Sequence, residues 1–307
     1  MDRLYALLRA AVALLLRNSP RVRGRGRVAI IVNRVFPATP AHATVRAPMR
    51  LHYSMLVDLR STVEESLAYY LGEYDTEHIR GLLRLFRPDW TVLDVGANVG
   101  FYTIPMASAV QARGRLHAFE PVASNFSRLS ENVRRNGLEY VAQLHQMGLS
   151  DQNGVLRISL REGFANGAQT GNAEIVIDQD DERFECVETK VARLDDIAGS
   201  LGIDRLDFVK VDIEGHEDKF LAGAQTTIQR FRPVILLEIN NHCYERRGLD
   251  PTALFERWQN EARYEAAYEI SPHVWIMRGI RERKGSVENV LFLPAENAES
   301  AIKRLRP

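Results

Sequence analysis

From Trp90 onward, short buried strands alternate with helices, and this alternation constrains the fold more than any other feature of the sequence. The predicted strands cover residues 91–95, 115–119, 141–146, 206–211 and 233–239. Such alternation is typical of an α/β fold, in which helices cover both faces of a mostly parallel sheet. The stretch 151–191 breaks the rhythm with alternating polar and apolar residues, which predicts an antiparallel insertion.

The first 27 residues combine an apolar run, 4–16, with five arginines between Arg17 and Arg27. The run is too short to cross ~30 Å of hydrocarbon as a helix. It also lacks the small-residue cleavage site of a signal peptide. We expect a helix docked on the protein; a membrane-surface helix with a basic border is the alternative, and it would make the protein peripheral to a membrane.

Residues 28–89 are predicted to form an N-terminal α/β cover, with strands at 28–35 and 45–53. Ser61 and Glu64 have the spacing of a capping box, and a second helix is expected from Asp75. Residues 90–307 then form the main domain, with the insertion near 151–191.

The chain of 307 residues balances 40 Lys+Arg against 40 Asp+Glu, so its formal net charge is zero. This balance argues against a nucleic-acid partner held by bulk charge. Cys186 and Cys243 are too few and too far apart for a disulfide framework or a zinc knuckle. A cytoplasmic location is the expectation.

A glycine-rich turn, Asp94-Val-Gly96-Ala-Asn98-Val-Gly100, follows the first buried strand. Gly96 and Gly100 permit a tight turn and a close approach of the backbone to a ligand. Asn98 and the missing third glycine depart from the dinucleotide fingerprint, and Asp94 would repel a diphosphate. The carboxylate suits the cationic amino-acid portion of S-adenosylmethionine. A simple strand-to-helix joint is the alternative.

Polar residues also follow the next two strands. Glu120 comes about twenty residues after the glycine turn, where an acid in such folds reaches ribose hydroxyls. Ser150 and Asp151 follow the third strand and are expected either to bond the adenine amino group or to form a turn before the insertion. Carboxylates at the ends of two strands, without the complete glycine-rich loop that binds a diphosphate, favour adenosine joined to methionine over NAD.

Asp212, Glu214 and His216 follow the strand at 206–211, at the sheet edge where open α/β sheets bind ligands. The Pro-Pro turn that holds planar amines in nucleic-acid methyltransferases is missing, which favours an oxygen acceptor. The catalytic base is then a carboxylate with a raised pKa or His216, whose ordinary pKa is ~6.5. Transfer without a dedicated base is a further alternative.

A metal-assisted mechanism would draw its ligands from four residues after the last two of these strands: Asp212, Glu238, Asn240 and His242. Ordinary polar loop residues are the preferred interpretation, so no metal site is predicted.

Residues 92–238 resemble the FkbM-type methyltransferases, S-adenosylmethionine-dependent enzymes that mostly methylate hydroxyls of sugars and natural products. The resemblance rests on the segments 93–100, 118–121, 125–126, 131–132, 148–151, 194–196, 208–215, 223–224 and 232–233, and on Glu238. It implies a class I methyltransferase fold, Rossmann-like with a seven-stranded sheet. It also implies cofactor contacts from five residues: Asp94, Gly96, Asn98, Gly100 and Glu120.

We therefore expect an S-adenosylmethionine-dependent O-methyltransferase that acts on a hydroxyl of a sugar, glycan or natural product. Two alternatives come from other classes: a dinucleotide-binding oxidoreductase, and a methyltransferase-fold scaffold without activity. The sequence indicates neither the acceptor nor the oligomeric state.

Overall fold

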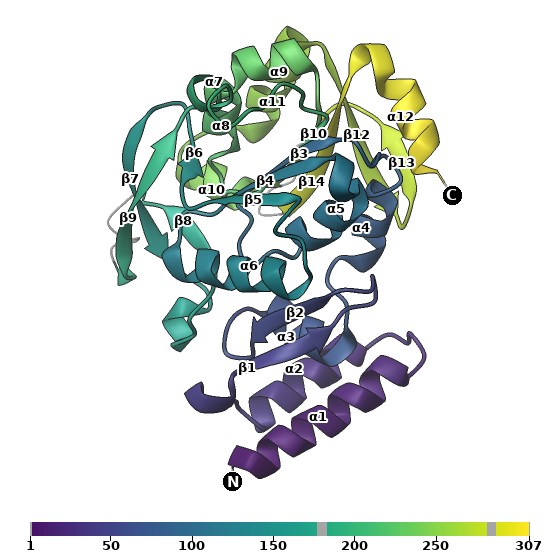
Figure 1. The fold of residues 1–307 in the computed structure, drawn as a ribbon, viewed down its shortest axis with the longest axis vertical. Helices are drawn as coiled ribbons and strands as arrows, with labels where there is room; N and C mark the ends of the chain where they lie inside the picture. Colours follow the sequence, from purple (N-terminus) through teal and green to yellow (C-terminus); the bar gives the residue numbers. More distant parts are fainter. Residues whose placement is uncertain (1, 177–182, 281–286, 307) are drawn as a thin grey trace.

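The computed structural model describes residues 2–176, 183–280 and 287–306, and within these ranges an eight-stranded sheet forms the centre of the molecule (Figure 1). From one edge to the other the strands are β13 (Val274–Met277), β12 (Tyr264–Ser271), β14 (Val287–Pro294), β11 (Val234–Asn240), β10 (Phe208–Val211), β3 (Thr91–Val95), β4 (Arg115–Phe119) and β5 (Ala142–His145).

The five strands from β11 to β5 are parallel, which confirms the expected mostly parallel sheet. β14 runs antiparallel to both of its neighbours, so β12 points the same way as the parallel set. Seven strands were expected. The additional strand in the described ranges is β13, which forms a hairpin with β12 at the sheet edge.

Successive residues of each strand point to opposite faces of the sheet, and a hydrophobic core covers each face. Val92 belongs to one hydrophobic core and Leu93 to the other. The first core includes α5 (Thr103–Val110), α6 (Ala123–Arg135) and α12 (Ala298–Leu305). The second includes α7 (Leu194–Ile197), α8 (Glu217–Gly223), α9 (Gln225–Phe231), α10 (Asn241–Arg246) and α11 (Pro251–Ala262).

The predicted antiparallel insertion is confirmed as a separate small sheet. Its strands are β6 (Gly148–Leu149), β9 (Cys186–Ala192), β7 (Gly154–Leu160) and β8 (Ala173–Ile175), in that spatial order. β7 pairs antiparallel with both β8 and β9. Figure 1 shows this sheet beside the β5 edge of the large sheet.

Residues 28–35 are helical, so the predicted strand there is wrong. They belong to α2 (Arg25–Val35), which also crosses the expected boundary at residue 27. Their β-branched residues favour a strand locally, but tertiary packing overrides that weak preference. Ala29 is buried within the hydrophobic core, and Asn33 donates to the Leu59 carbonyl at 2.8 Å and to Ser66 Oγ at 3.0 Å.

The rest of the N-terminal region is a helical hairpin and a two-stranded sheet, placed away from the large sheet in Figure 1. α1 (Asp2–Asn18) packs against α2 and against α3 (Val63–Leu71). β1 (Thr44–Pro48) pairs with β2 (Ser54–Asp58), so the predicted strand at 45–53 covers β1 and the following turn. None of the helices in the described ranges is both long and apolar enough to span a bilayer.

The next two helices begin close to their predicted positions. α3 is capped by Thr62 rather than Ser61: its hydroxyl accepts from the Glu65 amide at 3.4 Å. α4 (Thr76–Leu82) follows Asp75 and ends before Pro88, which cannot continue a helix. α3 and α4 thus connect the hairpin to the first strand of the large sheet.

Candidate active site

Two adjoining cavities lie at the carboxyl ends of the parallel strands. Their open volumes are about 800 Å³ and about 670 Å³. The residues that line both are Gly96, Asn98, Asn172, Asp212 and Glu214. The edge of the sheet that carries the three sequence motifs is therefore hollow, and the two cavities share part of their lining.

The first cavity, called here the apolar cavity, has mostly hydrophobic walls. Phe119 and Val122 line it from the large sheet and the segment that follows, and the insertion closes it with Ile158, Ile175 and Val191. A flat and largely apolar group such as a nucleobase matches these walls.

The second cavity, called here the acidic cavity, is lined by carboxyl groups. Those in the described chain are Glu64, Glu65, Asp94, Asp212, Glu214 and Glu238. Lys210 is the one lysine or arginine among the described residues that line it, and its Nζ lies 3.0 Å from Asp212 Oδ2 and 4.7 Å from the centroid of the Tyr102 ring. Excess negative charge therefore faces the cavity.

The glycine turn packs directly against the chain that follows β10. Gly96 has φ +82°, and a Cβ there would lie 1.8 Å from the Asp212 carbonyl oxygen. Gly100 has φ +102°, and its Cβ would lie 2.9 Å from Leu129 Cδ1. Only glycine satisfies both the left-handed backbone and the close approach at residue 96. The backbone conformation and the contact with Asp212 therefore explain why the motif has glycine at residue 96.

Asp94 is buried at the wall of the acidic cavity. Its Oδ2 accepts a hydrogen bond from Thr103 Oγ1 at 2.6 Å, whereas its Oδ1 has no hydrogen-bond partner among the described residues. Burial raises the pKa of Asp94, and nearby Lys210 opposes that rise. A buried acceptor without a partner is costly, so a cationic donor at Oδ1 would be stabilised.

Glu120 lines the apolar cavity and braces the glycine turn. Its Oε2 accepts from the Asn98 amide at 2.8 Å, and its Oε1 accepts from the Val122 amide at 2.9 Å. Burial raises the pKa of Glu120 to about 7 despite these hydrogen bonds. A carboxylate offers about four acceptor positions, so Oε2 retains one for a hydroxyl donor.

Ser150 and Asp151 are not among the described residues that line either cavity; Gly148 and Leu149 line the apolar cavity instead. Ser150 Oγ lies 3.0 Å from His216 Nε2, and Asp151 pairs with Lys219 at 2.8 Å. Both side chains therefore lie outside the lining of the two cavities.

All three predicted catalytic residues line the apolar cavity. His216 lines the apolar cavity, and its Nε2 faces Ser150. Burial lowers the pKa of His216 to about 4, so its imidazole is neutral at pH 7 and a weak base. Asp212 and Glu214 also line the acidic cavity, whereas His216 does not.

Glu238 lines the acidic cavity together with these two carboxyl groups. The sequence indicated a role for Glu238 only as a ligand of the alternative metal site. β10 and β11 are parallel with Val211 opposite Leu237, so Asp212 and Glu238 follow at neighbouring strand ends. Repulsion from Asp212, together with burial, raises the pKa of Glu238 to about 8. Burial and Asp212 raise the pKa of Glu214 to about 7, although Asn240 donates to it at 3.0 Å.

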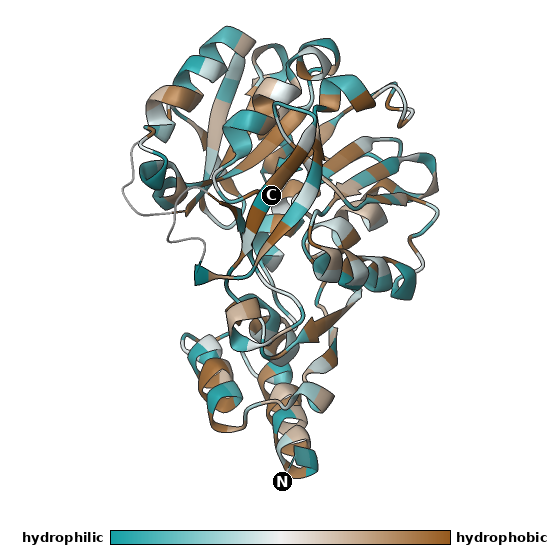
Figure 2. Cartoon of the chain, turned by 90° about the vertical axis from the view of Figure 1, so that its left-hand side faces the viewer, coloured by the Kyte–Doolittle hydropathy of each residue, from teal (hydrophilic) through white to brown (hydrophobic). Residues whose placement is uncertain are grey.

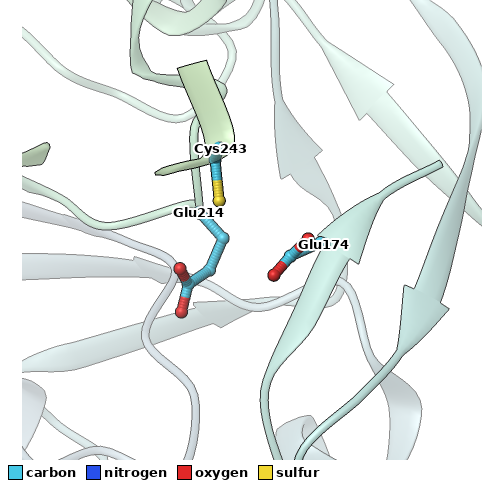
Figure 3. Close-up of side chains that lie close together, drawn as sticks. All are labelled: Glu174, Glu214 and Cys243. Carbon is cyan, nitrogen blue, oxygen red and sulfur yellow. The ribbon is translucent and has the colours of Figure 1, made fainter. Parts of the chain in front are cut away.

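The structure does not assemble the alternative metal site. Asp212 and Glu238 share the acidic cavity, but Asn240 bonds Glu214 and His242 is exposed on α10. Another cluster, Glu174, Glu214 and Cys243, brings one ligand atom each within 4.8 Å of the others (Figure 3).

The chemistry of this second cluster does not favour a cation. Glu174 already pairs with Arg161 at 3.0 Å and with Arg246 at 2.8 Å. Burial raises the pKa of Cys243 to about 12, which keeps the thiol protonated and therefore a poor ligand. We assign no metal to this position.

Residues 94–266 match the family model described as the methyltransferase FkbM domain. This chain belongs to the FkbM methyltransferase family. The match runs from Asp94 to the start of β12. It includes the residues at the ends of the parallel strands that line the two cavities. Together with the mostly parallel sheet, it confirms the class I methyltransferase fold.

Curated relatives are distant in sequence. The chain is 30% identical over 161 residues to 31-O-demethyl-FK506 methyltransferase FkbM of Streptomyces tacrolimicus, covering 45% of this chain and 61% of that protein. It is 29% identical over 180 residues to hexuronic acid methyltransferase AglP of Haloferax volcanii, covering 59% and 65%.

A third relative is AMB antimetabolite synthetase AmbE of Pseudomonas aeruginosa, 29% identical over 179 residues that make up 48% of this chain and 8% of that protein. The chain thus spans less than two thirds of each of these three relatives. A crystal structure of methyltransferase FkbM from Methylobacillus flagellatus aligns with 95% of this chain and 58% of its own, at 16% identity and a TM-score of 0.44.

Proposed function

We propose that the protein is an S-adenosylmethionine-dependent methyltransferase that acts on a hydroxyl of a sugar, glycan or natural product. The observation that carries the proposal is the junction of an apolar cavity and a carboxylate-lined cavity at the glycine turn, with Asp94, which has one buried and unpartnered carboxyl oxygen, in the wall of the second cavity. The relatives' names support an oxygen acceptor, as does 2-O-methyltransferase NoeI of Sinorhizobium fredii, 26% identical over 171 residues.

The residues present fit S-adenosylmethionine. The apolar cavity would hold the adenine between Phe119 and the insertion strands, and Glu120 would accept from the ribose hydroxyls. Asp94 Oδ1 would accept from the ammonium group, which accounts for its lack of a partner. When bound, this cofactor supplies a methyl group on a cationic sulfur.

The acidic cavity is the proposed acceptor site. Its carboxylates accept hydrogen bonds from hydroxyl groups and repel anions, so a neutral or cationic polyol is favoured over a phosphorylated or carboxylated acceptor. Glu238 and Glu214 have raised pKa values, which suit them to accept a proton near neutral pH. One of them would accept the hydroxyl proton as the acceptor oxygen takes the methyl group that the bound cofactor would supply.

Aromatic residues limit the access of water to this cavity. Tyr74 stacks on Phe101 with ring centroids 4.2 Å apart, and Tyr102 lies edge-on to Tyr74 at 6.2 Å. These three rings line the acidic cavity together with its carboxyl groups. Exclusion of water and alignment of the reacting atoms are the main requirements of an in-line methyl transfer.

The test has two steps with the full chain. Calorimetric titration should show saturable binding of S-adenosylmethionine and no binding of NADH. Labelled donor should then transfer its methyl group to members of a panel of neutral and cationic sugars and polyketides, and less to their phosphorylated counterparts. Binding without transfer to any acceptor would favour the scaffold alternative, and NADH binding would favour the oxidoreductase.

A further inference from the structure

One apolar side of α1 faces away from the protein, although Val12, Ala13 and Leu16 pack against the core on the other side. Four leucines on the outward side are 58–69% exposed: Leu4, Leu7, Leu14 and Leu15. On the opposite side Arg9 is 2% exposed and Ala13 is buried. Figure 2 shows hydrophobic segments in brown along the helices next to the N-terminus.

Hydrogen bonds from arginines to backbone carbonyls fix this orientation. Arg9 Nη1 donates to the carbonyls of Phe36 at 2.9 Å and Pro37 at 3.0 Å. Arg17 donates to the carbonyl of Tyr69, on α3. Rotating α1 to bury its leucines would break these bonds and leave buried carbonyls without partners, so the outward leucines are part of the folded structure.

α2 continues the exposed apolar surface. Val28, Ile31 and Val35 are 45%, 59% and 57% exposed, while Ala29 points into the core. α1 and α2 contact each other. We call the exposed aliphatic side chains of these two contacting helices the hairpin surface; large aliphatic side chains exposed in this number on one pair of helices point to an interaction site.

The charge around the hairpin surface is one-sided. Residues 1–40 contain eight arginines and one acidic residue, Asp2, although the whole chain is balanced at 40 and 40. Arg3, Arg23, Arg27 and Arg34 are exposed on α1, α2 and the turn between them. An occupant of this surface must therefore be apolar in the middle and negatively charged around it.

We propose that the α1–α2 hairpin docks on the surface of an anionic lipid bilayer. The leucines would enter the boundary between headgroups and acyl chains, and the exposed arginines would lie among the headgroups. A second copy of the chain is a poorer occupant because it would bring the same excess of arginines against this one. Nucleic acid is a poorer occupant because it offers nothing to cover the aliphatic side chains.

Vesicle flotation tests the proposal with the full chain. We expect flotation with phosphatidylcholine vesicles that contain 30% phosphatidylglycerol, and at least tenfold weaker partitioning into pure phosphatidylcholine. Leu7→Glu with Leu14→Glu should abolish flotation. Arg23→Glu with Arg27→Glu should weaken partitioning by roughly fivefold or more for each arginine and reduce its dependence on salt, since each cation near an anionic surface contributes about that factor.

A matched control carries the same number of exposed aliphatic-to-glutamate changes outside the hairpin: Val155→Glu with Ile270→Glu, at 57% and 55% exposure. It should float like the unmodified protein. Because Leu7 and Leu14 are exposed, their variant should keep its melting temperature, which separates loss of docking from loss of folding.

Three results would overturn the proposal. The first is no flotation with either vesicle. The second is equal flotation with neutral and anionic vesicles. The third is a concentration-dependent dimer, measured by sedimentation velocity, that forms whether or not vesicles are present and is lost in the Leu7/Leu14 variant. Such a dimer would assign the hairpin surface to a second copy of the chain.

Discussion

At the scale of single residues, Asp94 gives the clearest test of cofactor binding. Asp94→Asn keeps the shape and removes the charge, so the affinity for S-adenosylmethionine should fall roughly 10–100-fold, as for a lost hydrogen bond to a charged group. The melting temperature of the ligand-free protein should change little, since burial already disfavours the charged carboxylate. Calorimetry and thermal melts measure both quantities.

The control for this substitution is Asp89→Asn, which removes an exposed carboxylate that pairs with Arg205 away from the cavities. It should leave the affinity unchanged. If Asp94→Asn binds as tightly as the unmodified chain, the unpartnered oxygen is not the ammonium site.

Glu238 is expected to act as the base, and the order of two variants tests this. Glu238→Gln should lower kcat by roughly 10²–10⁴-fold with little change in donor affinity, the range for loss of a general base. His216→Gln should lower kcat by less than tenfold, because His216 faces Ser150. Equal losses in both variants would contradict the assignment.

The pH profile gives a second readout of the same residue. A base must be deprotonated to act, and the pKa of Glu238 is raised to about 8. The kcat should therefore rise with pH up to about 8 and then level off. In Glu238→Gln this rise should disappear or move toward pH 7, where Glu214 titrates.

At the scale of elements, the glycine turn after β3 should tolerate no side chain at residue 96. Gly96→Ala places a Cβ 1.8 Å from a backbone oxygen at a positive φ, so the free energy of unfolding should fall by at least about 2 kcal/mol. Gly137→Ala has a similar φ, +64°, but nothing within 4 Å of the Cβ, so it should cost only about 1 kcal/mol. Denaturant unfolding compares the two variants, and equal losses would mean that the contact with Asp212 is unimportant.

The strands and helices of the main domain could be predicted because their signals are local. Strand β3 is a short apolar run that ends in a glycine turn, and α6 stops just before Asn136-Gly137, a local helix-stop signal. α2 could not be predicted from its β-branched residues, because contacts of Ala29 and Asn33 with distant parts of the chain decide its conformation.

The site residues that belong to local sequence motifs could be predicted. Those whose position depends on which strands are neighbours could not. Asp94, Glu120, Asp212 and Glu214 line the cavities as their motifs indicated. Lys210 lies inside a buried strand, and the closeness of Glu238 to Asp212 depends on which strands are neighbours. Whether His216 points toward the acceptor depends on its side-chain direction, which has no signature in the sequence.

At the scale of the whole molecule, buried carboxyl groups should make stability depend on pH. Burial raises the pKa of Glu120 and Glu217 to about 7, and Glu238 reaches about 8 by repulsion from Asp212 and burial. Acids with raised pKa values bind more protons in the folded state than in the unfolded state, so the stability they contribute at low pH is lost as the pH rises to 8.

The lowered pKa of His216 acts in the opposite direction, but only below its ordinary value of ~6.5. Between pH 6.5 and 8 the free energy of unfolding should therefore fall by at least about 1 kcal/mol. Denaturant unfolding at both pH values measures this, and Glu238→Gln should show a smaller fall. A stability that rises over this range would contradict the protonation of these groups.

Helix α3 contacts both helices of the hairpin, and Glu64 and Glu65 near its start line the acidic cavity. A single rigid helix thus sets the distance between the cavity and whatever surface the hairpin occupies. An acceptor free in water would reach the cavity by a search in three dimensions. One tethered to the same bilayer would search only two, so its density on that surface, rather than its bulk concentration, would govern how often it enters.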